Sequence, residues 1–306
     1  MSTLINAAPE EGAVNESRHE FDAKARTQGQ IVLRRFLRHK LAMASVGVLV
    51  LLVLIAFIGP LFMSYSYDDT SSGPYLRPSG EHLLGTTQVG KDMLALLMRG
   101  TQYSLQIALI VAVVSTLIGV VFGSVAGYLR GATETVLMRV VDLLMIVPQI
   151  AVAAILVKGL SGSWTTVAIV LALFGWMSIA RITRGETLSL SQREFVEAAR
   201  ALGASTPQII FRHLVPNMIG SITVNATLSC ATAVLAEAAL SFIGLGVQLP
   251  DTSLGVVVQE NYTQLITRPW LFWGPFLVIV LISLAINFIG DGLRDAFDPR
   301  QTKVRA

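Results

Sequence analysis

Few residues in this 306-residue chain have the types and spacing that catalysis or metal binding needs. The single cysteine, Cys230, lies inside an apolar run, which argues against a disulfide framework and against a cysteine-rich metal site. The four histidines (His19, His39, His82 and His213) all lie outside the apolar runs. A zinc site or a serine–histidine pair buried in those runs is therefore not expected. We predict no catalytic residue and no metal ligand.

The segment GTTQVGKD at residues 85–92 nearly matches the phosphate-binding loop GxxxxGK[ST]. In that loop the residue after the lysine offers a hydroxyl to Mg²⁺, whereas Asp92 offers a carboxylate that would repel phosphate. No strand-like run precedes the segment. We therefore expect no nucleotide at residues 85–92 and no cofactor on this chain, so any ATP and Mg²⁺ would be bound by another polypeptide.

Two carboxylates stand within or directly after long apolar runs, where an ionisable group usually faces a cavity or a partner. Asp142 follows Arg139 by three residues on one helix face, which leaves open a local ion pair or a place on an inner pathway. Glu237 follows 23 uncharged residues, so we expect it near the outer surface, in a gating or hydrogen-bonding role. Further candidates for lining a path are Gln149, Trp176 and Asn225.

The composition indicates that membrane-spanning helices hold these residues. The chain is 53% hydrophobic and 14% charged, against about 25% charged residues in soluble domains. A helix needs about 20 apolar residues to cross the hydrocarbon core. Six runs meet that need, at residues 41–67, 101–129, 139–158, 164–180, 214–236 and 270–290. The expected fold class is an all-α membrane protein with six transmembrane helices.

The basic residues predict the orientation of the spans. With the N-terminus in the cytoplasm, 18 of the 23 Lys and Arg residues fall in cytoplasmic segments, as the positive-inside rule requires. We therefore expect a multi-pass protein with both termini cytoplasmic, and the net charge of +3 gives no reason to expect a nucleic acid. The predicted divisions are a tail at 1–40, the first transmembrane helix at 41–67, an extracytoplasmic loop at 68–100, a five-span domain at 101–291 and a tail at 292–306.

The second span carries Ser115, Gly119, Gly123 and Gly127 at intervals of four residues. Such a stripe of small residues on one helix face lets a second helix approach closely. The stripe predicts that this span is packed among other helices.

The longest internal cytoplasmic segment, residues 181–213, reads as two short helices around a glycine corner. Ser191 and Glu194 have the spacing of a capping box, and Gly203 fits the left-handed position that ends a helix. Pro207 is tolerated in the first turn of the second helix, which we expect to end at Pro216. A corner projecting from the membrane either binds a partner or merely connects two spans.

The sequence EAARALG at residues 197–203, followed by HLVPN at 213–217, resembles the EAA motif of bacterial ABC importer permeases. In that family the motif, here within the loop at 191–216, forms a coupling helix that sits in a cleft of the ATP-hydrolysing subunit. The resemblance implies that Glu197, Ala198, Ala199 and Gly203 are the signature residues. It places Arg193, Ala204 and Ser205 near the same contact.

The resemblance covers about residues 83–300 and is closest to the C-type permease subunits of the oligopeptide/dipeptide/nickel importers. The segments that carry it include LLGTTQVGKDMLALLMRG, AGYLRG, MRVVDLLMIVPQ, WMSIARITRGETLSL, EAALSFIGLGVQLPDTSLG and NFIGDGLRDAFDPR. Thr87 and Lys91 stand where the family usually has Asp and Arg, and Leu249 and Leu254 where Pro and Trp are common. These departures lie outside the EAA motif.

The resemblance implies a type I importer permease fold in the bacterial cytoplasmic membrane, with a cytoplasmic coupling helix. The implied function is a permease subunit that passes oligopeptides, or dipeptides, into the cytoplasm without hydrolysing ATP itself. The implied partners are a second permease, two ATPase domains that are separate or fused, an extracytoplasmic peptide-binding protein and the lipid bilayer. A nickel or metal-chelate importer remains an alternative, as does an ion-coupled secondary transporter, although no inverted repeat is evident.

Overall fold

The computed structural model describes residues 28–298, and within that range the chain is helical, without a strand. The outer parts of the two predicted tails, residues 1–27 and 299–306, lie outside the described residues. Five helices are long and apolar enough to cross a membrane, and a bent helix pair can form a sixth span. The all-α fold with six spans is therefore confirmed.

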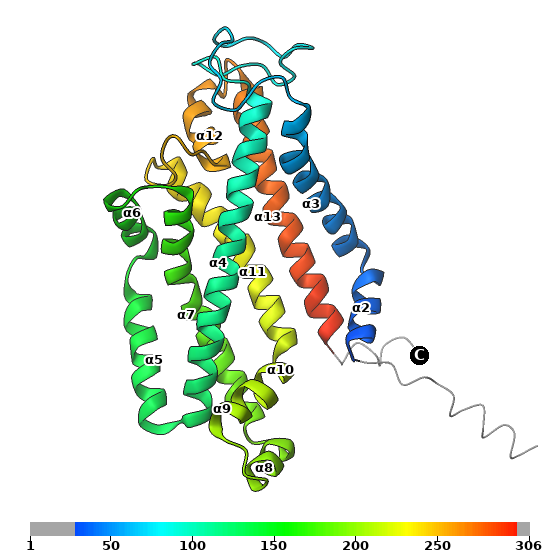
Figure 1. The fold of residues 1–306 in the computed structure, drawn as a ribbon, viewed down its shortest axis with the longest axis vertical. Coiled ribbons are helices and arrows are strands. Elements are labelled where there is room, and N and C mark those ends of the chain that lie inside the picture. Colours follow the sequence, from blue (N-terminus) through cyan, green and yellow to red (C-terminus); the bar gives the residue numbers. More distant parts are fainter. Residues whose placement is uncertain (1–27, 299–306) are drawn as a thin grey trace, which may run out of the picture.

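The spans run alternately up and down the long axis of the molecule (Figure 1). The spanning elements are α3 (Lys40–Ile58) continued by η1 (Gly59–Phe62), α4 (Met93–Leu129), α5 (Gly131–Ile146) with α6 (Gln149–Gly159), α7 (Trp164–Leu190), α11 (Ile219–Phe242) and α13 (Pro269–Phe297). The shorter elements are α2 (Gln28–Arg38), α8 (Glu194–Ala201), α9 (Thr206–Gln208), η2 (Ile209–Leu214), α10 (Val215–Asn217), α12 (Leu254–Asn261) and η3 (Tyr262–Gln264).

The two ends of the bundle differ. Residues 63–92 and α12 gather at one end, called here the loop end, while α8 and α9 project from the other, called the α8 end (Figure 1). Helix α2 continues the bundle from within the predicted N-terminal tail, where the Arg35 guanidinium donates to the carbonyl of Asp298 after α13 at 3.1 Å. Part of that tail is therefore an ordered helix.

Helices α4 and α7 form the tightest helix pair, and the predicted stripe of small residues lies between them. A Cβ atom at Gly123 would lie 2.4 Å from the carbonyl oxygen of Ala180, and one at Gly127 would lie 2.7 Å from that of Arg184. Across the pair, a Cβ at Gly175 would meet the Ser115 hydroxyl at 2.5 Å. The prediction that the stripe permits close packing is confirmed, because no larger residue fits there.

The third span consists of two helices and is not continuous. Helices α5 and α6 meet at an angle of 81° around Val147 and Pro148. Proline disfavours helical geometry in the residue before it, and Val147 adopts an extended conformation with ψ at 132°. The span predicted at 139–158 is therefore present as two helices, because Pro148 interrupts helical geometry inside an otherwise continuous apolar run.

Candidate functional site

Helix α8 is amphipathic and is held to the bundle by one face. Val196 is fully buried and Ala199 is 8% exposed. Val196 packs in a small apolar cluster with Ile209, Ile210, Leu214 and Met218. This cluster anchors α8 to the segment between α7 and α11, so the rest of α8 is free to project from the bundle.

The opposite face of α8 is exposed, and the helix itself lies at the α8 end of the bundle (Figure 1). Leu202, directly before the glycine corner, is 89% exposed, and Phe195, at the start of α8, is 39% exposed. Of the seven residues expected at a partner contact, five are exposed, Ala204 is half-buried and Ala199 is buried; the exposed ones are Arg193, Glu197, Ala198, Gly203 and Ser205. Sequence reasoning missed Leu202, whose signal was an apolar side chain directly before the helix-ending glycine.

The corner after α8 has the geometry expected of a glycine stop. Gly203 has φ at +82°, and its N–H donates to the carbonyl of Arg200 at 3.0 Å. The N–H of Ala204 donates to the carbonyl of Ala199 at 3.0 Å, closing the last turn. The prediction for Gly203 is confirmed, since other residues rarely adopt this backbone conformation.

The predicted capping box at Ser191 is wrong. Ser191 ends α7, and its hydroxyl donates to the carbonyl of Leu188 at 3.0 Å. Helix α8 begins at Glu194, after Arg193, which makes no side-chain cap. The serine is used by the preceding helix because α7 runs ten residues beyond its uncharged core, as far as Leu190.

The second helix of the loop also differs from expectation at its end. The chain passes from α9 into a π-helical turn at η2 and then into α10, where Val215 N–H donates to the carbonyl of Ile210. Pro216 stands in the first turn of α10, a position that needs no backbone donor, and so does not end the helix. The break comes instead at Met218, before α11.

Two arginine contacts join the α8 region to α4. The guanidinium of Arg200 lies 5.8 Å from the ring centroid of Tyr128, near the end of α4. Arg130, directly after α4, donates to the Ser191 hydroxyl at 3.0 Å. A cation over an aromatic ring contributes about 0.5–1 kcal/mol at exposed sites, so the contact between Arg200 and Tyr128 stabilises the position of α8 only modestly.

Glu237 lies inside the loop end of the bundle, and its side chain is fully buried. Its carboxylate accepts hydrogen bonds from the hydroxyls of Ser104 on α4 at 2.9 Å and Ser241 on α11 at 2.7 Å. The expectation that Glu237 emerges near the surface is wrong, whereas a hydrogen-bonding role is what the structure gives it. Continuation of α11 to Phe242 keeps the residue inside the helix packing.

The same serines hold the segment that follows α11. The Ser104 hydroxyl accepts from the N–H of Leu254 at 3.2 Å, and the Ser241 hydroxyl accepts from the N–H of Val247 at 3.2 Å. Ser253 caps α12 and donates to Ser241 at 3.3 Å. Glu237 is therefore the centre of a buried network that joins α4, α11 and α12.

Asp142 pairs with another helix and not with Arg139. Its carboxylate accepts from Arg181 of α7 at 2.5 Å, and Glu134 of α5 pairs in the same way with Arg184. Together with Arg139 these charges line a cavity of about 570 Å³ between α5 and α7. The predicted ion pair between Arg139 and Asp142 is therefore wrong. Their spacing of three residues on one helix could not reveal that Arg181 of α7 would be the partner of Asp142.

The other three path candidates have different surroundings. Gln149 is exposed at the start of α6, beside the break in the third span. Trp176 is 7% exposed, with its ring centroid 4.8 Å from that of Phe122. Asn225 is half-buried and donates to the carbonyl of Ser221 at 2.9 Å, within its own helix. The structure does not bring these three together.

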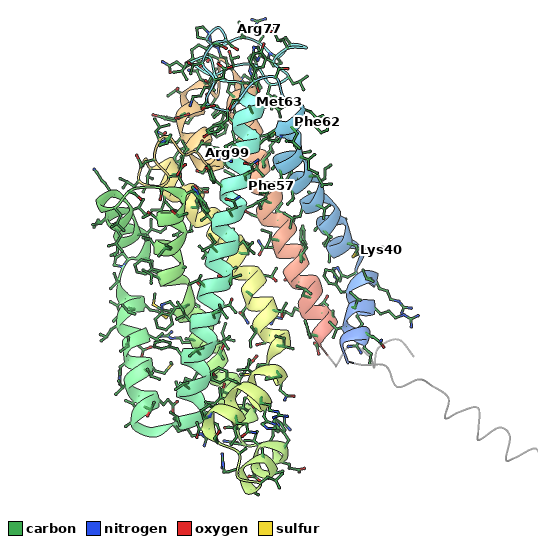
Figure 2. The ribbon with its side chains drawn as sticks, in the orientation of Figure 1. Lys40, Phe57, Phe62, Met63, Arg77 and Arg99 are labelled. Carbon is green, nitrogen blue, oxygen red and sulfur yellow. The ribbon has the colours of Figure 1, made fainter. Side chains whose placement is uncertain are left out.

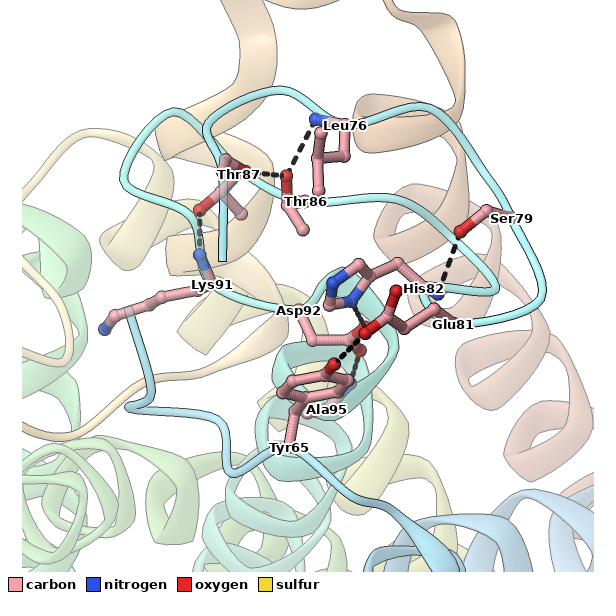
Figure 3. A network of polar contacts seen from close by, with 11 residues as sticks. Tyr65, Leu76, Ser79, Glu81, His82, Thr86, Thr87, Lys91, Asp92 and Ala95 are labelled. Carbon is pink, nitrogen blue, oxygen red and sulfur yellow. Dashed lines mark hydrogen bonds and ion pairs between the residues drawn. The ribbon is translucent and has the colours of Figure 1, made fainter. Parts of the chain in front are cut away.

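The loop-like segment at residues 85–92 is closed by its own side chains (Figure 3). Asp92 caps α4, since one carboxylate oxygen accepts from the N–H of Ala95 at 2.9 Å, while the other lies 2.8 Å from His82 Nδ1. His82 and Asp92 are both almost fully buried, and the ring of Tyr65 lies over His82. A carboxylate thus occupies the N-terminus of α4, the position at which a phosphate-binding loop would hold its ligand.

Comparisons with known proteins agree with this architecture. Residues 119–303 match the family described as binding-protein-dependent transport system inner membrane component, and residues 27–79 match the N-terminal TM domain of oligopeptide transport permease C. The oligopeptide transport system permease protein OppC of Mycobacterium tuberculosis is 43% identical over 278 residues, covering 90% of this chain and 96% of that protein.

Two further relatives are less identical but cover the chain to a similar extent. OppC of Escherichia coli K12 is 37% identical, covering 94% of this chain and 97% of that protein. The dipeptide transport system permease protein DppC of Bacillus subtilis is 36% identical, covering 96% of this chain and 94% of that protein.

A solved structure shows the same fold at lower identity. A chain of the MetNI methionine ABC transporter, in an inward-facing conformation, matches with a TM-score of 0.56 and 21% identity, covering 67% of this chain and 98% of that one. The helix order, the family match and the relatives lead to one conclusion: this chain is a multi-pass membrane protein of the binding-protein-dependent transport system inner membrane component family.

Proposed function

We propose that this chain is a membrane-spanning permease subunit of an ATP-driven importer that carries oligopeptides into the cytoplasm. The observation that carries the proposal is α8, a short helix with Val196 and Ala199 buried against the bundle. Its outer face bears Glu197 and Ala198 of the EAA motif, and the exposed side chain of Leu202 follows directly after it. Such a face suits insertion into a cleft of a soluble subunit, because a large apolar side chain in the open gains free energy when a partner covers it.

The proposed orientation puts the α8 end in the cytoplasm and the loop end outside, with both termini cytoplasmic. The distribution of basic residues supports it, since Arg193, Arg200 and Arg212 all lie at the α8 end. The partners in this proposal are a second permease subunit, two ATPase domains at the α8 end, and a solute-binding protein at the loop end. The chain contributes no ATPase site of its own, and ATP with Mg²⁺ belongs to the partner ATPase.

The cargo we propose is an oligopeptide, because the relatives that cover most of the chain are named for oligopeptide transport, with dipeptide transport as the closest variation. A nickel or metal-chelate cargo is not favoured by those relatives. The charged cavity between α5 and α7 and the exposed Gln149 offer polar groups of both signs, which suits zwitterionic cargo passing along that face.

In the proposed cycle, ATP binding brings the two ATPase domains together and displaces α8 of each permease. The helices then expose the path to the solute-binding protein, and hydrolysis restores the cytoplasm-facing state. The Glu237 network holds α4, α11 and α12 together at the outer gate during this change. No bond of the cargo is made or broken by this chain.

The test of the coupling contact uses two matched substitutions. The complex is purified with its partner permease, ATPase and solute-binding protein, and Leu202→Glu is compared with Leu83→Glu, since Leu83 is 60% exposed at the loop end. We expect Leu202→Glu to release the ATPase subunits and abolish peptide uptake in proteoliposomes, while Leu83→Glu retains the ATPase. Retention of the ATPase by Leu202→Glu with normal uptake would contradict the proposal.

The cargo is tested separately with the wild-type complex. Uptake of a labelled pentapeptide is measured in the presence of unlabelled pentapeptide, dipeptide or Ni²⁺. We expect competition by the pentapeptide above all, weaker competition by the dipeptide and none by Ni²⁺. Uptake that continues without ATP hydrolysis would instead support an ion-coupled carrier.

A further inference from the structure

A cavity of about 370 Å³ lies at the loop end between the end of α3 and the first turns of α4. Its walls include Ser64, Tyr65 and Tyr67 from the chain after η1, and Arg99 and Gln102 from α4. The transport cycle described above makes no use of it, since it lies on the α3 side of α4 and the path candidates lie elsewhere. The cavity nevertheless has polar walls that include the guanidinium of Arg99.

Arg99 is held in a fixed orientation there. Its Nη1 donates to Gln102 Oε1 at 2.7 Å and its Nη2 donates to the Tyr103 hydroxyl at 2.5 Å. Gln102 is 8% exposed and its Nε2 donates in turn to the carbonyl of Ala56 on α3 at 2.6 Å. The guanidinium also lies 5.1 Å from the ring centroid of Tyr67. These contacts fix the plane of the guanidinium before any ligand arrives.

The fixed guanidinium keeps unused donors. Its Nε is buried and has no hydrogen-bond partner. Among the described residues, no Asp or Glu oxygen lies within 4.0 Å of an Arg99 nitrogen. A buried charged donor without a partner costs free energy, which an anion would recover. The cavity therefore suits an oxyanion.

The position of the cavity along the bundle indicates where such an anion comes from. The first span, from Lys40 to Phe62, has 23 residues, which at 1.5 Å per residue is about 34 Å, close to the thickness of the hydrocarbon core. Figure 2 places Arg99 at a level between Phe57 and Phe62, near the end of that span. This is the level of lipid headgroups in the leaflet at the loop end.

Two exposed apolar side chains lie next to the cavity in the chain. Leu61 is 80% exposed and Phe62 is 84% exposed, directly before the segment that walls the cavity. In a bilayer these side chains contact acyl chains, while Arg99 lines the cavity together with Tyr65 and Tyr67. The exposed apolar side chains and the half-buried guanidinium together match the two parts of a phospholipid.

We propose that the Arg99 cavity binds the phosphate group of a phospholipid from the leaflet at the loop end. The guanidinium offers its free N–H groups to the phosphate oxygens, and the hydroxyls of Ser64 and Tyr67 in the wall donate to the remaining ones. The hydroxyls of Tyr65 and Ser66 already donate to Glu81 and Asp68. The acyl chains lie over Leu61 and Phe62. The bound lipid would contact both the end of α3 and the start of α4 and so hold them together.

The experiment is native mass spectrometry of the purified, delipidated complex with three probes. Phosphatidylglycerol is the lipid probe, diacylglycerol with the same chains lacks the phosphate, and inorganic phosphate lacks the chains. Wild type is compared with Arg99→Gln and with Arg77→Gln, a matched change at an exposed arginine of the loop end (Figure 2). Ser64→Trp, at an exposed position in the cavity wall, fills the cavity and leaves Arg99 in place.

We expect wild type and Arg77→Gln to retain one more phosphatidylglycerol than Arg99→Gln and Ser64→Trp, with at least tenfold weaker binding in the latter two. Diacylglycerol should bind all four weakly and equally, and millimolar phosphate should not displace the lipid. Equal lipid retention by all variants would overturn the proposal. Full displacement by inorganic phosphate would also overturn it, showing a free-anion site. If Arg99→Gln does not fold, Ser64→Trp decides the outcome.

Discussion

The carboxylate of Glu237 accepts a hydrogen bond from the hydroxyl of Ser104, 133 positions earlier in the chain, inside the apolar core of the bundle. The same serine accepts from the N–H of Leu254, so one hydroxyl links the last turns of α11 to the start of α12. Because each group uses its hydrogen-bonding capacity on another, the network is buried without leaving these groups unsatisfied.

Removing the acceptor of this network should destabilise the loop end. Glu237→Leu leaves the Ser104 and Ser241 hydroxyls without their acceptor, at a cost of about 1–3 kcal/mol for each buried unsatisfied group. We expect a clear fall in the thermal unfolding temperature of the purified protein in detergent. Glu237→Gln keeps an amide oxygen and an N–H group for the two hydroxyls, so its unfolding temperature should fall much less. Equal falls in the unfolding temperature of both variants would contradict this account.

Because α4 packs closely on α7, we predict that a methyl group added at Gly123 destabilises the protein. A Cβ there would lie 2.4 Å from the carbonyl oxygen of Ala180, so Gly123→Ala must push the helices apart, at a cost of about 1–3 kcal/mol. Gly47→Ala on α3 is the matched control, because nothing lies within 4 Å of its added methyl group. Thermal unfolding should show loss for the first and no loss for the second, since alanine is the better helix former.

The anchoring of α8 can be tested without any partner. Val196→Asp places a carboxylate in the apolar cluster that holds the helix, whereas Ala198→Ser changes an exposed position of the same helix. We expect amide exchange at residues 194–201 to speed up at least tenfold in the first variant, which corresponds to about 1.4 kcal/mol of lost local stability. Unchanged exchange in Val196→Asp would show that α8 is held by contacts other than this cluster.

Asp92 is predicted to be structural. Asp92→Ala removes both the cap of α4 and the partner of His82, so we expect a loss of about 1–2 kcal/mol from the cap alone. Asp68→Ala, in the same segment but exposed, should leave thermal unfolding unchanged. Calorimetric titration with Mg–ATP should give no heat of binding for wild type; binding that disappears in Asp92→Ala would revive the phosphate-loop interpretation.

The sequence was sufficient for features that depend on local chemistry. Charge-free runs predict spans because the bilayer excludes charge, and four-residue spacing of glycines predicts a packed face because helical geometry brings those residues into line. Gly203 was predictable because a left-handed residue strongly favours glycine. The break before Pro148 was also available from local rules, and was missed because the apolar run was given more weight.

Features that depend on distant parts of the chain were not predictable in this way. Arg181 is 39 residues from Asp142, and nothing in the spacing ranks it above Arg139. The burial of Glu237 depends on where α4 and α12 pack, although Ser104 and Ser241 in apolar surroundings were a hint that buried acceptors were needed. The exposure of Leu202 follows from the orientation of α8, which is set by the apolar cluster around Val196.

The length of α4 has a mechanical consequence. Its 37 residues form one uninterrupted rod of about 55 Å, from the cap at Asp92 to the ring of Tyr128 beneath Arg200. A rod without a hinge behaves as a lever, so that a tilt of about 10° around its midpoint would displace each tip by about 5 Å in opposite directions. A push delivered at α8 would therefore reach the far side of the membrane as a displacement of the 63–92 segment, without any change of helix conformation in between.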